Sequence, residues 1–299
     1  MRAPRILTLL LLLAASCGPD KNGVGQLPPL EHARRATVAL EIRGRDEHGA
    51  WVSHATGSIV DAAGYVVTCE HVTATGTRQE VFLHDGRRAP YRVVARAGGS
   101  FDLALLAFEP PGPLTVMPLG DGDGPGVGEL VTILGNPGGA GIRALEARVR
   151  RVDAGAGTQL ETVEAAVVPG DSGGPVLDAQ GRMVAHVHVA IRGHPGVARH
   201  VTVAHVRRAF RGWLWNGADR PGVRIACDGG PARVLAVRPN APAARAGIAV
   251  GDVVSHVDGV VVPDGIAAVL RSLDHPAGRP WTWRLRRAGE VRTVRFSSE

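Results

Sequence analysis

The most informative segment of this chain is Val168-Pro169-Gly170-Asp171-Ser172-Gly173-Gly174-Pro175. Small residues around Ser172 let a carbonyl substrate approach its hydroxyl. A tight turn can aim the N–H groups of Gly170 and Ser172 at one point, as an oxyanion hole requires. The alternative is a glycine-rich hairpin turn with an incidental serine. We interpret the stretch as a nucleophile turn, with the oxyanion hole at Gly170, Asp171 and Ser172.

A serine nucleophile needs a base, and the base needs an orienting group. Of the twelve histidines, His71 follows an apolar, β-branched run that begins at Gly64 and predicts a buried strand. Asp102 leads directly into the apolar run 103–108, where an unpaired carboxylate would be costly. A half-buried structural histidine and a strand-capping aspartate are the alternatives. The pattern predicts a triad in the chain order His71, Asp102, Ser172.

Further motifs stand in order around these residues. They are Gly57-Ser58-Ile59-Val60, 81–87 (VFLHDGR), Asp102-Leu103-Ala104-Leu105, 118–121 (PLGD), 127–129 (VGE), 133–137 (ILGNP) and 162–166 (TVEAA). In this register the chain beyond residue 36 resembles the HtrA (Deg) family of trypsin-fold serine proteases. The resemblance implies that His71 acts as general base and then general acid, that Asp102 holds its tautomer, and that Ser172 forms an acyl-enzyme. Asp171 stands where that family usually has asparagine and the trypsin group has aspartate.

The expected fold is an all-β trypsin-like double β-barrel over residues 37–207, a linker or helix over 208–221 and a small α+β PDZ domain over 222–297. A chain of 299 residues has room for about two domains, and its 40 glycines suit many short strands and turns. Export would permit a disulfide between Cys69 and Cys227. Because Cys69 lies beside the histidine and Cys227 begins the second domain, we expect two separate buried thiols.

The N-terminus has the pattern of an export signal. Arg2 and Arg5 precede a short apolar run that ends Leu13-Ala14-Ala15-Ser16-Cys17. This end resembles a bacterial lipobox, which predicts a lipoprotein signal peptide over 1–16 and lipidation of Cys17; ordinary cleavage nearby is the alternative. Residues 17–36 are expected to form a flexible tether. These features place the protein in the bacterial periplasm, anchored by lipid to the inner or outer membrane.

The PDZ resemblance rests on Val234–Val237, the run 239–248 (PNAPAARAGI), Gly251–Val254 and Val257-Asp258-Gly259. PDZ domains add a peptide to a sheet edge and capture its terminal carboxylate in a backbone nest. The corresponding segment here is Val223, Arg224 and Ile225, with arginine where glycine is common. Arg224 could attract the carboxylate or block the nest.

Trimer formation is doubtful, because the N-terminal segment lacks the aromatic residues that family trimers use.

The specificity pocket is predicted beside Val184–His188, where His186 and His188 would project to the same side of a strand. Glutamate-selective members of the wider trypsin group use a pocket histidine on this strand, so an acidic cleavage preference is one hypothesis. Cleavage after small aliphatic residues, as in the HtrA family, is the other. The histidines between 186 and 205 have no HExxH or Cys-x-x-Cys spacing, so neither a metal nor another cofactor is expected.

The net charge of +6 comes almost wholly from arginine, and aromatic residues make up only 4% of the chain. The sequence has no arginine clusters interleaved with aromatic residues, so this composition favours a solvated basic surface over nucleic-acid binding.

Three functions remain open: an ATP-independent serine endopeptidase for unfolded or damaged envelope proteins, a membrane-tethered protease gated by C-terminal peptides at the PDZ domain, and a weakly active chaperone-like binding protein. The absence of a GxxxxGK[ST] motif favours independence from ATP.

Overall fold

The computed structural model describes residues 27–73, 76–97, 102–121, 124–152, 159–190, 193–194, 196–217, 219–276 and 278–298. The predicted signal peptide and the lipidation site at Cys17 lie outside these ranges. None of the helices in the described residues is long and apolar enough to cross a membrane.

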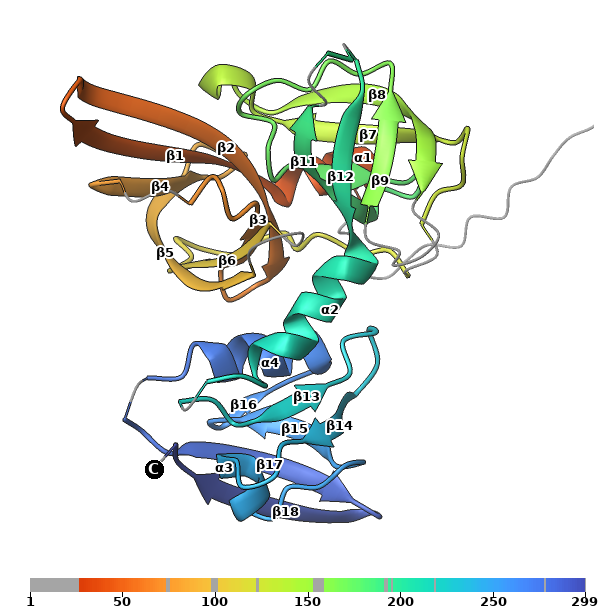
Figure 1. Cartoon of the computed structure of the whole chain (residues 1–299). Helices are drawn as coiled ribbons and strands as arrows, with labels where there is room; N and C mark the ends of the chain where they lie inside the picture. Colours follow the sequence, from red (N-terminus) through yellow and green to blue (C-terminus); the bar gives the residue numbers. More distant parts are fainter. Residues whose placement is uncertain are drawn as a thin grey trace, which may run out of the picture.

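The N-terminal half of the first domain is a closed antiparallel barrel with the strand order β1-β2-β3-β6-β5-β4 (Figure 1). Its strands are β1 Thr37–Asp46, β2 Gly49–Asp61, β3 Tyr65–Thr68, β4 Arg78–Phe82, β5 Arg88–Ala97 and β6 Leu103–Phe108. The strand β6 is buried along its whole length and pairs with β3 on one side and β5 on the other. That environment explains why its sequence is a continuous apolar run without alternation.

The second half is another closed barrel, with the order β10-β11-β12-β9-β8-β7. It comprises β7 Leu130–Gly135, the short helix η1 Pro137–Gly139, β8 Arg143–Val152, β9 Gln159–Val163, β10 Pro175–Leu177, β11 Met183–Ala190 and β12 Ala198–Thr202. The two barrels confirm the predicted trypsin-like double-barrel fold.

The helix α1, Pro29–Arg35, lies inside the range predicted to be a flexible tether. Ala33 and Ala36 are fully buried and pack with Met117, Leu134 and Met183 of the barrels. The structure therefore differs from the tether prediction at these residues. The small side chains of Ala33 and Ala36 allow the helix to pack closely, and that burial holds it on the protein.

The helix α2, Val203–Trp213, leads from the second barrel to the C-terminal domain. It begins inside the predicted protease range, where the Thr202 side chain caps it by accepting from the N–H of His205. The domain beyond it has the strand order β13-β14-β15-β17-β18, with β16 paired to β15. Its elements are β13 Val223–Ile225, β14 Ala232–Val237, α3 Pro242–Arg245, β15 Val253–Val257, β16 Val260–Val261, α4 Gly265–Leu273, β17 Trp281–Arg287 and β18 Glu290–Phe296.

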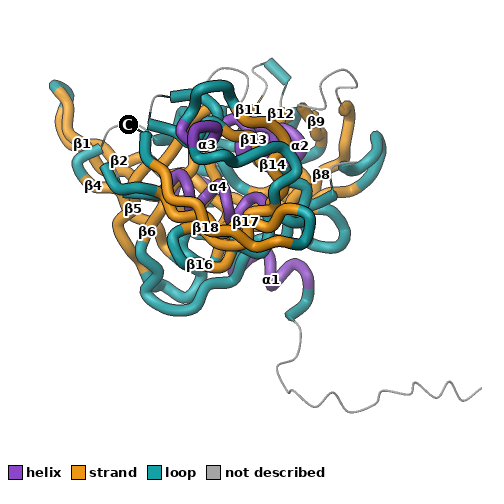
Figure 2. The backbone as a smooth tube through the Cα atoms, turned by 90° about the horizontal axis from the view of Figure 1, so that it is seen from below, coloured by secondary structure: helices purple, strands orange, loops and turns teal. Residues whose placement is uncertain are grey.

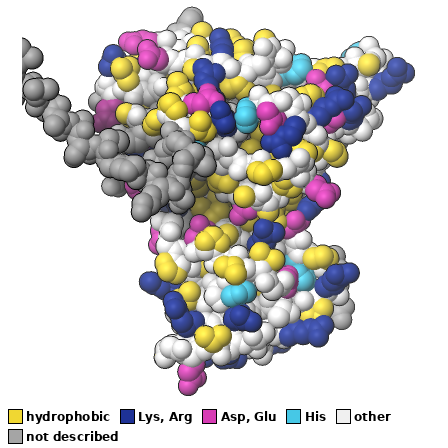
Figure 3. Space-filling model, turned by 180° about the vertical axis from the view of Figure 1, so that it is seen from behind, with side chains coloured by type: hydrophobic (Ala, Val, Ile, Leu, Met, Phe, Trp, Pro, Cys, Tyr) yellow, Lys and Arg dark blue, Asp and Glu magenta, His cyan; other side chains and the backbone are white. Residues whose placement is uncertain are grey.

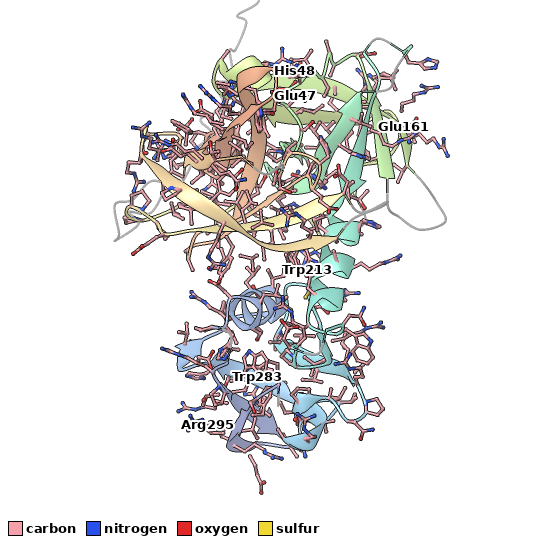
Figure 4. The ribbon with its side chains drawn as sticks, turned by 60° about the vertical axis from the view of Figure 1, so that its left-hand side comes forward. Glu47, His48, Glu161, Trp213, Trp283 and Arg295 are labelled. Atoms are coloured by element: carbon pink, nitrogen blue, oxygen red, sulfur yellow. The ribbon has the colours of Figure 1, made fainter. Side chains whose placement is uncertain are left out.

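The C-terminal domain packs against the first barrel through α2 and α4. In Figure 2, which views the molecule from below, β17 and β18 lie in front and α4 lies behind them, on the side of the barrels. Figure 4 places Trp213 at the end of α2 between the domains and Trp283 inside the C-terminal domain. The Tyr65 hydroxyl donates to Asp274 Oδ2 (2.9 Å), and Arg92 pairs with the same carboxylate. One apolar cluster contains Leu103 of the barrel together with residues of α2 and α4.

The charged side chains on the face shown in Figure 3 are of both signs and lie over both domains. On this face arginines are not gathered into one basic stripe. Such a distribution is what a solvated surface presents.

Candidate active site

Asp102 and His71 meet because their strands are neighbours in the first barrel. The antiparallel register of β3 and β6 pairs Thr68 with Ala104, so the end of β3 lies beside the start of β6. His71 Nδ1 lies 2.7 Å from Asp102 Oδ2, and the backbone N–H of His71 donates to Asp102 Oδ1 at 2.9 Å. The carboxylate thus holds His71 by one contact to the ring and one to the backbone, and the His71 side chain is about half exposed at 48%.

The electrostatics of Asp102 follow from these contacts. Burial by itself would raise the pKa of Asp102, but the hydrogen bonds from the side chain and the backbone N–H of His71 outweigh it. The pKa therefore lies below its usual range, and the carboxylate is ionised at neutral pH. An ionised partner at Nδ1 leaves Nε2 as the free base nitrogen of His71.

The turn that carries Ser172 packs against the first barrel. Gly173 has a φ of 84°, and a Cβ there would lie 2.2 Å from Thr56 O and from the Thr68 hydroxyl. Only glycine fits this approach, which brings the turn to the end of β3, the strand that leads to His71. The Ser172 carbonyl accepts from the N–H of Thr56 at 2.9 Å. In the described residues no hydrogen bond joins Ser172 Oγ to His71, as is common before substrate binds.

The three residues predicted to form the oxyanion hole differ in whether their backbone N–H groups are free to bind a substrate oxygen. The N–H of Asp171 donates to Val168 O at 3.0 Å and is therefore used within the turn. The N–H groups of Gly170 and Ser172 donate to no acceptor in the described part of the chain. Gly170 has a φ of 103°, and a Cβ there would lie 2.2 Å from Asn136 O. The geometry supports Gly170 and Ser172 as the two donors, and it does not support Asp171.

A buried polar frame holds this turn. The Asp171 carboxylate is fully buried, pairs with Arg143 at 2.9 Å and accepts from the N–H of Val168 at 3.0 Å. The Thr56 hydroxyl donates to Gly170 O at 2.7 Å and accepts from the N–H of Asn136 at 3.0 Å. Side chains of both barrels therefore fix the backbone that presents Ser172.

The two histidines assigned to the specificity pocket occupy other places. His186 is fully buried, with Nδ1 at 3.6 Å from Cys69 Sγ, and burial lowers its pKa to about 3. A fully buried ring presents no surface to a substrate, so the pocket prediction for His186 is wrong. His188 lies against the triad, with Nε2 at 3.2 Å from Asp102 Oδ2. Both rings do lie on the triad side of β11, as the alternation along the strand predicted.

Cys69, His71 and Asp102 form a group whose ligand atoms lie within 4.8 Å of one another. A thiolate is needed to hold a metal ion. Burial raises the pKa of the Cys69 thiol well above its usual value, Asp102 adds to this, and the thiol donates to Val187 O at 3.0 Å. In the absence of a metal ion, Cys69 is therefore a neutral thiol packed beside His71 and Asp102. Cys69 and Cys227 are separate, buried and free, as predicted.

The predicted peptide-binding segment of the C-terminal domain is covered by its own chain. Val223 and Ile225 are fully buried, in the same apolar cluster as residues of α2. The N–H groups of Gly222 and Val223 donate to the Leu214 carbonyl, at 2.9 and 3.2 Å. The Arg224 guanidinium lies 4.6 Å from the centroid of the Trp215 ring. In this conformation the side chains of Val223 and Ile225 do not line an open groove.

Comparison with protein families finds two matches. Residues 55–185 match a family described as a trypsin-like peptidase domain, and residues 233–287 match a PDZ domain. The first match contains His71, Asp102 and Ser172 and ends before His186. The second begins after Val223, Arg224 and Ile225.

Curated and solved proteins agree with these matches. A Brucella suis protein named probable periplasmic serine endoprotease DegP-like is 30% identical over 244 residues, which cover 74% of this chain and 47% of the relative. The chain thus spans about half the length of this relative. The structure of a serine endoprotease from Yersinia pestis has a TM-score of 0.54 at 22% identity and covers 90% of this chain and 96% of its own.

A second solved structure, an HtrA-type protease AlgW with decapeptide, has a TM-score of 0.53 at 23% identity and covers 90% of this chain and 97% of its own. At such identities the solved structures establish the fold, while the family matches and the curated relative establish the kinship. The chain is an HtrA (Deg)-like protein, with a trypsin-like peptidase domain followed by one C-terminal PDZ domain.

Proposed function

We propose that this protein is an ATP-independent serine endopeptidase of the bacterial envelope that hydrolyses peptide bonds in unfolded or damaged proteins. The observation that carries the proposal is the hydrogen-bonded pair of His71 and Asp102 at the barrel junction where the Ser172 turn packs. The Brucella relative is named a periplasmic serine endoprotease, which supports the periplasm as the compartment. A lipid anchor at Cys17 is a further part of the proposal and rests on the N-terminal sequence.

The mechanism assigns each group one task. His71 Nε2 takes the proton of Ser172 as the hydroxyl oxygen attacks the peptide carbonyl, and the N–H groups of Gly170 and Ser172 receive the oxyanion. His71 then gives that proton to the leaving amine, which departs and leaves an acyl-enzyme. Water attacks the ester by the same route in reverse and releases the acid and free Ser172. Asp102 stays ionised and stabilises the imidazolium.

The test combines digestion with covalent labelling. Mature protein is incubated with reduced, unfolded casein without ATP, and cut sites are read by mass spectrometry. In parallel, a fluorophosphonate probe is added and the modified residue is mapped. We expect ATP-independent cleavage and a single label on Ser172. Absence of both cleavage and label would contradict the proposal and favour a chaperone-like binding protein. The cut sites also decide between acidic and small aliphatic preferences.

A second candidate, a protease gated by peptides at the PDZ domain, is favoured by the covered peptide segment. A C-terminal peptide that docked along β13 would have to displace the Leu214 carbonyl from the N–H groups of Gly222 and Val223. Because Leu214 is the C-cap residue of α2, such displacement would act on the element that joins the two domains.

For the gated candidate we expect a peptide with an apolar C-terminus and a free carboxylate to stimulate cleavage, while its C-terminal amide does not. Trp215→Ala removes the contact with Arg224 and should lower the peptide concentration for half-maximal stimulation by roughly two- to fivefold, the range of an exposed cation–π contact. Arg238→Ala, directly after the neighbouring strand β14, is a control for the loss of a nearby basic contact. Cleavage that does not respond to either peptide would contradict gating and leave the first proposal standing.

A further inference from the structure

We propose that His188 is a positioning residue for the triad, whose Nε2 N–H holds the Asp102 carboxylate as a second imidazole donor. This inference rests on the proposed function. His188 Nε2 lies 3.2 Å from Asp102 Oδ2, the same oxygen that contacts His71 Nδ1 at 2.7 Å. The two imidazole rings have centroids 6.2 Å apart, with their planes 43° apart. One carboxylate is thus shared by two imidazoles.

The protonation state of His188 follows from its surroundings. Burial lowers the pKa of His188, and although Asp102 opposes this, the pKa stays below its usual value. The ring is therefore neutral at neutral pH and carries one proton. Its Nδ1 is buried and has no partner in the described residues, while Nε2 faces a carboxylate oxygen. A lone pair at Nε2 would face the negative oxygen, so the Nε2–H tautomer is the favourable one.

The other groups around His188 agree with a neutral ring. His71 contacts the same oxygen of Asp102, and its charged form disfavours a second charge on His188. Arg199, from the neighbouring strand β12, also lowers the pKa of His188, and its guanidinium is paired with Glu161 at 3.2 Å. His186 and the thiol of Cys69, which lie beneath the triad, are neutral because they are fully buried.

The contact has a defined consequence for the triad. Asp102 Oδ1 accepts from the N–H of His71, while Oδ2 lies 2.7 Å from His71 Nδ1 and 3.2 Å from His188 Nε2. A proton on His188 Nε2 would give the carboxylate a third donor, which restricts its rotation and so fixes the direction in which it holds His71. Removal of His188 should therefore loosen the orientation of His71.

The test compares His188→Leu, which has no donor, with His188→Gln, which keeps an N–H donor. The control is His48→Leu, an exposed histidine at the tip of the β1–β2 hairpin (Figure 4). We expect His188→Leu to lower kcat on a peptide substrate by roughly tenfold with KM changed less than about twofold, since orientation is lost and binding is not. His188→Gln should recover part of the loss.

One NMR measurement needs no activity. In the wild type labelled with ¹⁵N-histidine, His188 should show the neutral Nε2–H tautomer at pH 7; a neutral Nδ1–H tautomer or an imidazolium would overturn the proposal. If His188→Leu and the wild type agree in kcat, His188 has no positioning role. If the wild type hydrolyses nothing, the proposed function fails, while the tautomer still decides the role of His188.

Discussion

Replacement of Ser172 with alanine is expected to lower kcat/KM for casein-derived peptides by roughly five to six orders of magnitude, the loss that removal of a triad serine typically causes. The folded state should be unaffected. The Ser172 carbonyl bond to the N–H of Thr56 is made by the backbone, and alanine keeps it. The measurement is initial-rate kinetics together with thermal unfolding, which should change little.

The matched control for this variant is Ser53→Ala, an exposed serine on β2. It should retain wild-type kinetics and fluorophosphonate labelling. Equal activity of Ser172→Ala and the wild type would show that another group, or a contaminating protease, carries out the cleavage. An unfolded Ser172→Ala protein would contradict the expectation that the hydroxyl has no structural task.

Asp102→Asn should lower kcat by about four orders of magnitude at neutral pH, as expected when the base is held in the wrong tautomer. Asparagine has nearly the same shape, but its amide group turns a donor toward one of the imidazoles. The side chain then cannot accept from His71 Nδ1 and from the N–H of His71 together. The kinetics should be measured from pH 5 to pH 9, with exposed Asp228→Asn as the control.

The Asp102→Asn variant also separates two roles of the carboxylate. Fluorophosphonate labelling of Ser172 should slow along with hydrolysis, because both need a base at His71 Nε2. A variant that loses hydrolysis but labels at the wild-type rate would show that Asp102 acts on substrate binding. That result would contradict its assignment as the group that orients His71.

The pairing of His71 with Asp102 was predictable from sequence because each of the two residues ends or begins a segment with a clear pattern. The run before His71 and the run after Asp102 are paired strands, so their adjoining ends had to meet once the barrel closed. Glycine at 173 could be identified from the pattern, and the structure gives the reason in its positive φ and its contact with Thr56. Local pattern and barrel topology were sufficient for these residues.

Other features depended on contacts between segments far apart in the chain. The alternation along β11 predicts that His186 and His188 lie on the same side of the strand. It does not predict how deeply each ring is buried: His186 is fully buried, whereas His188 lies beside Asp102. The helix α2 covers Val223 and Ile225. Its amphipathic pattern predicts that one face is buried, but not which segment that face packs against. The short helix α1 lies between prolines and a strand, and its burial depends on a cluster built from both barrels.

The helix α2 also bears on how the molecule melts. Its apolar side shares one cluster with the first barrel and with the PDZ sheet, and Arg207 reaches from it to the carbonyls of Cys227 and Gly120. Separation of the two domains would expose this shared apolar surface to water, which costs free energy. We therefore expect each domain to stabilise the other, so that on heating the two should lose their structure over the same temperature range.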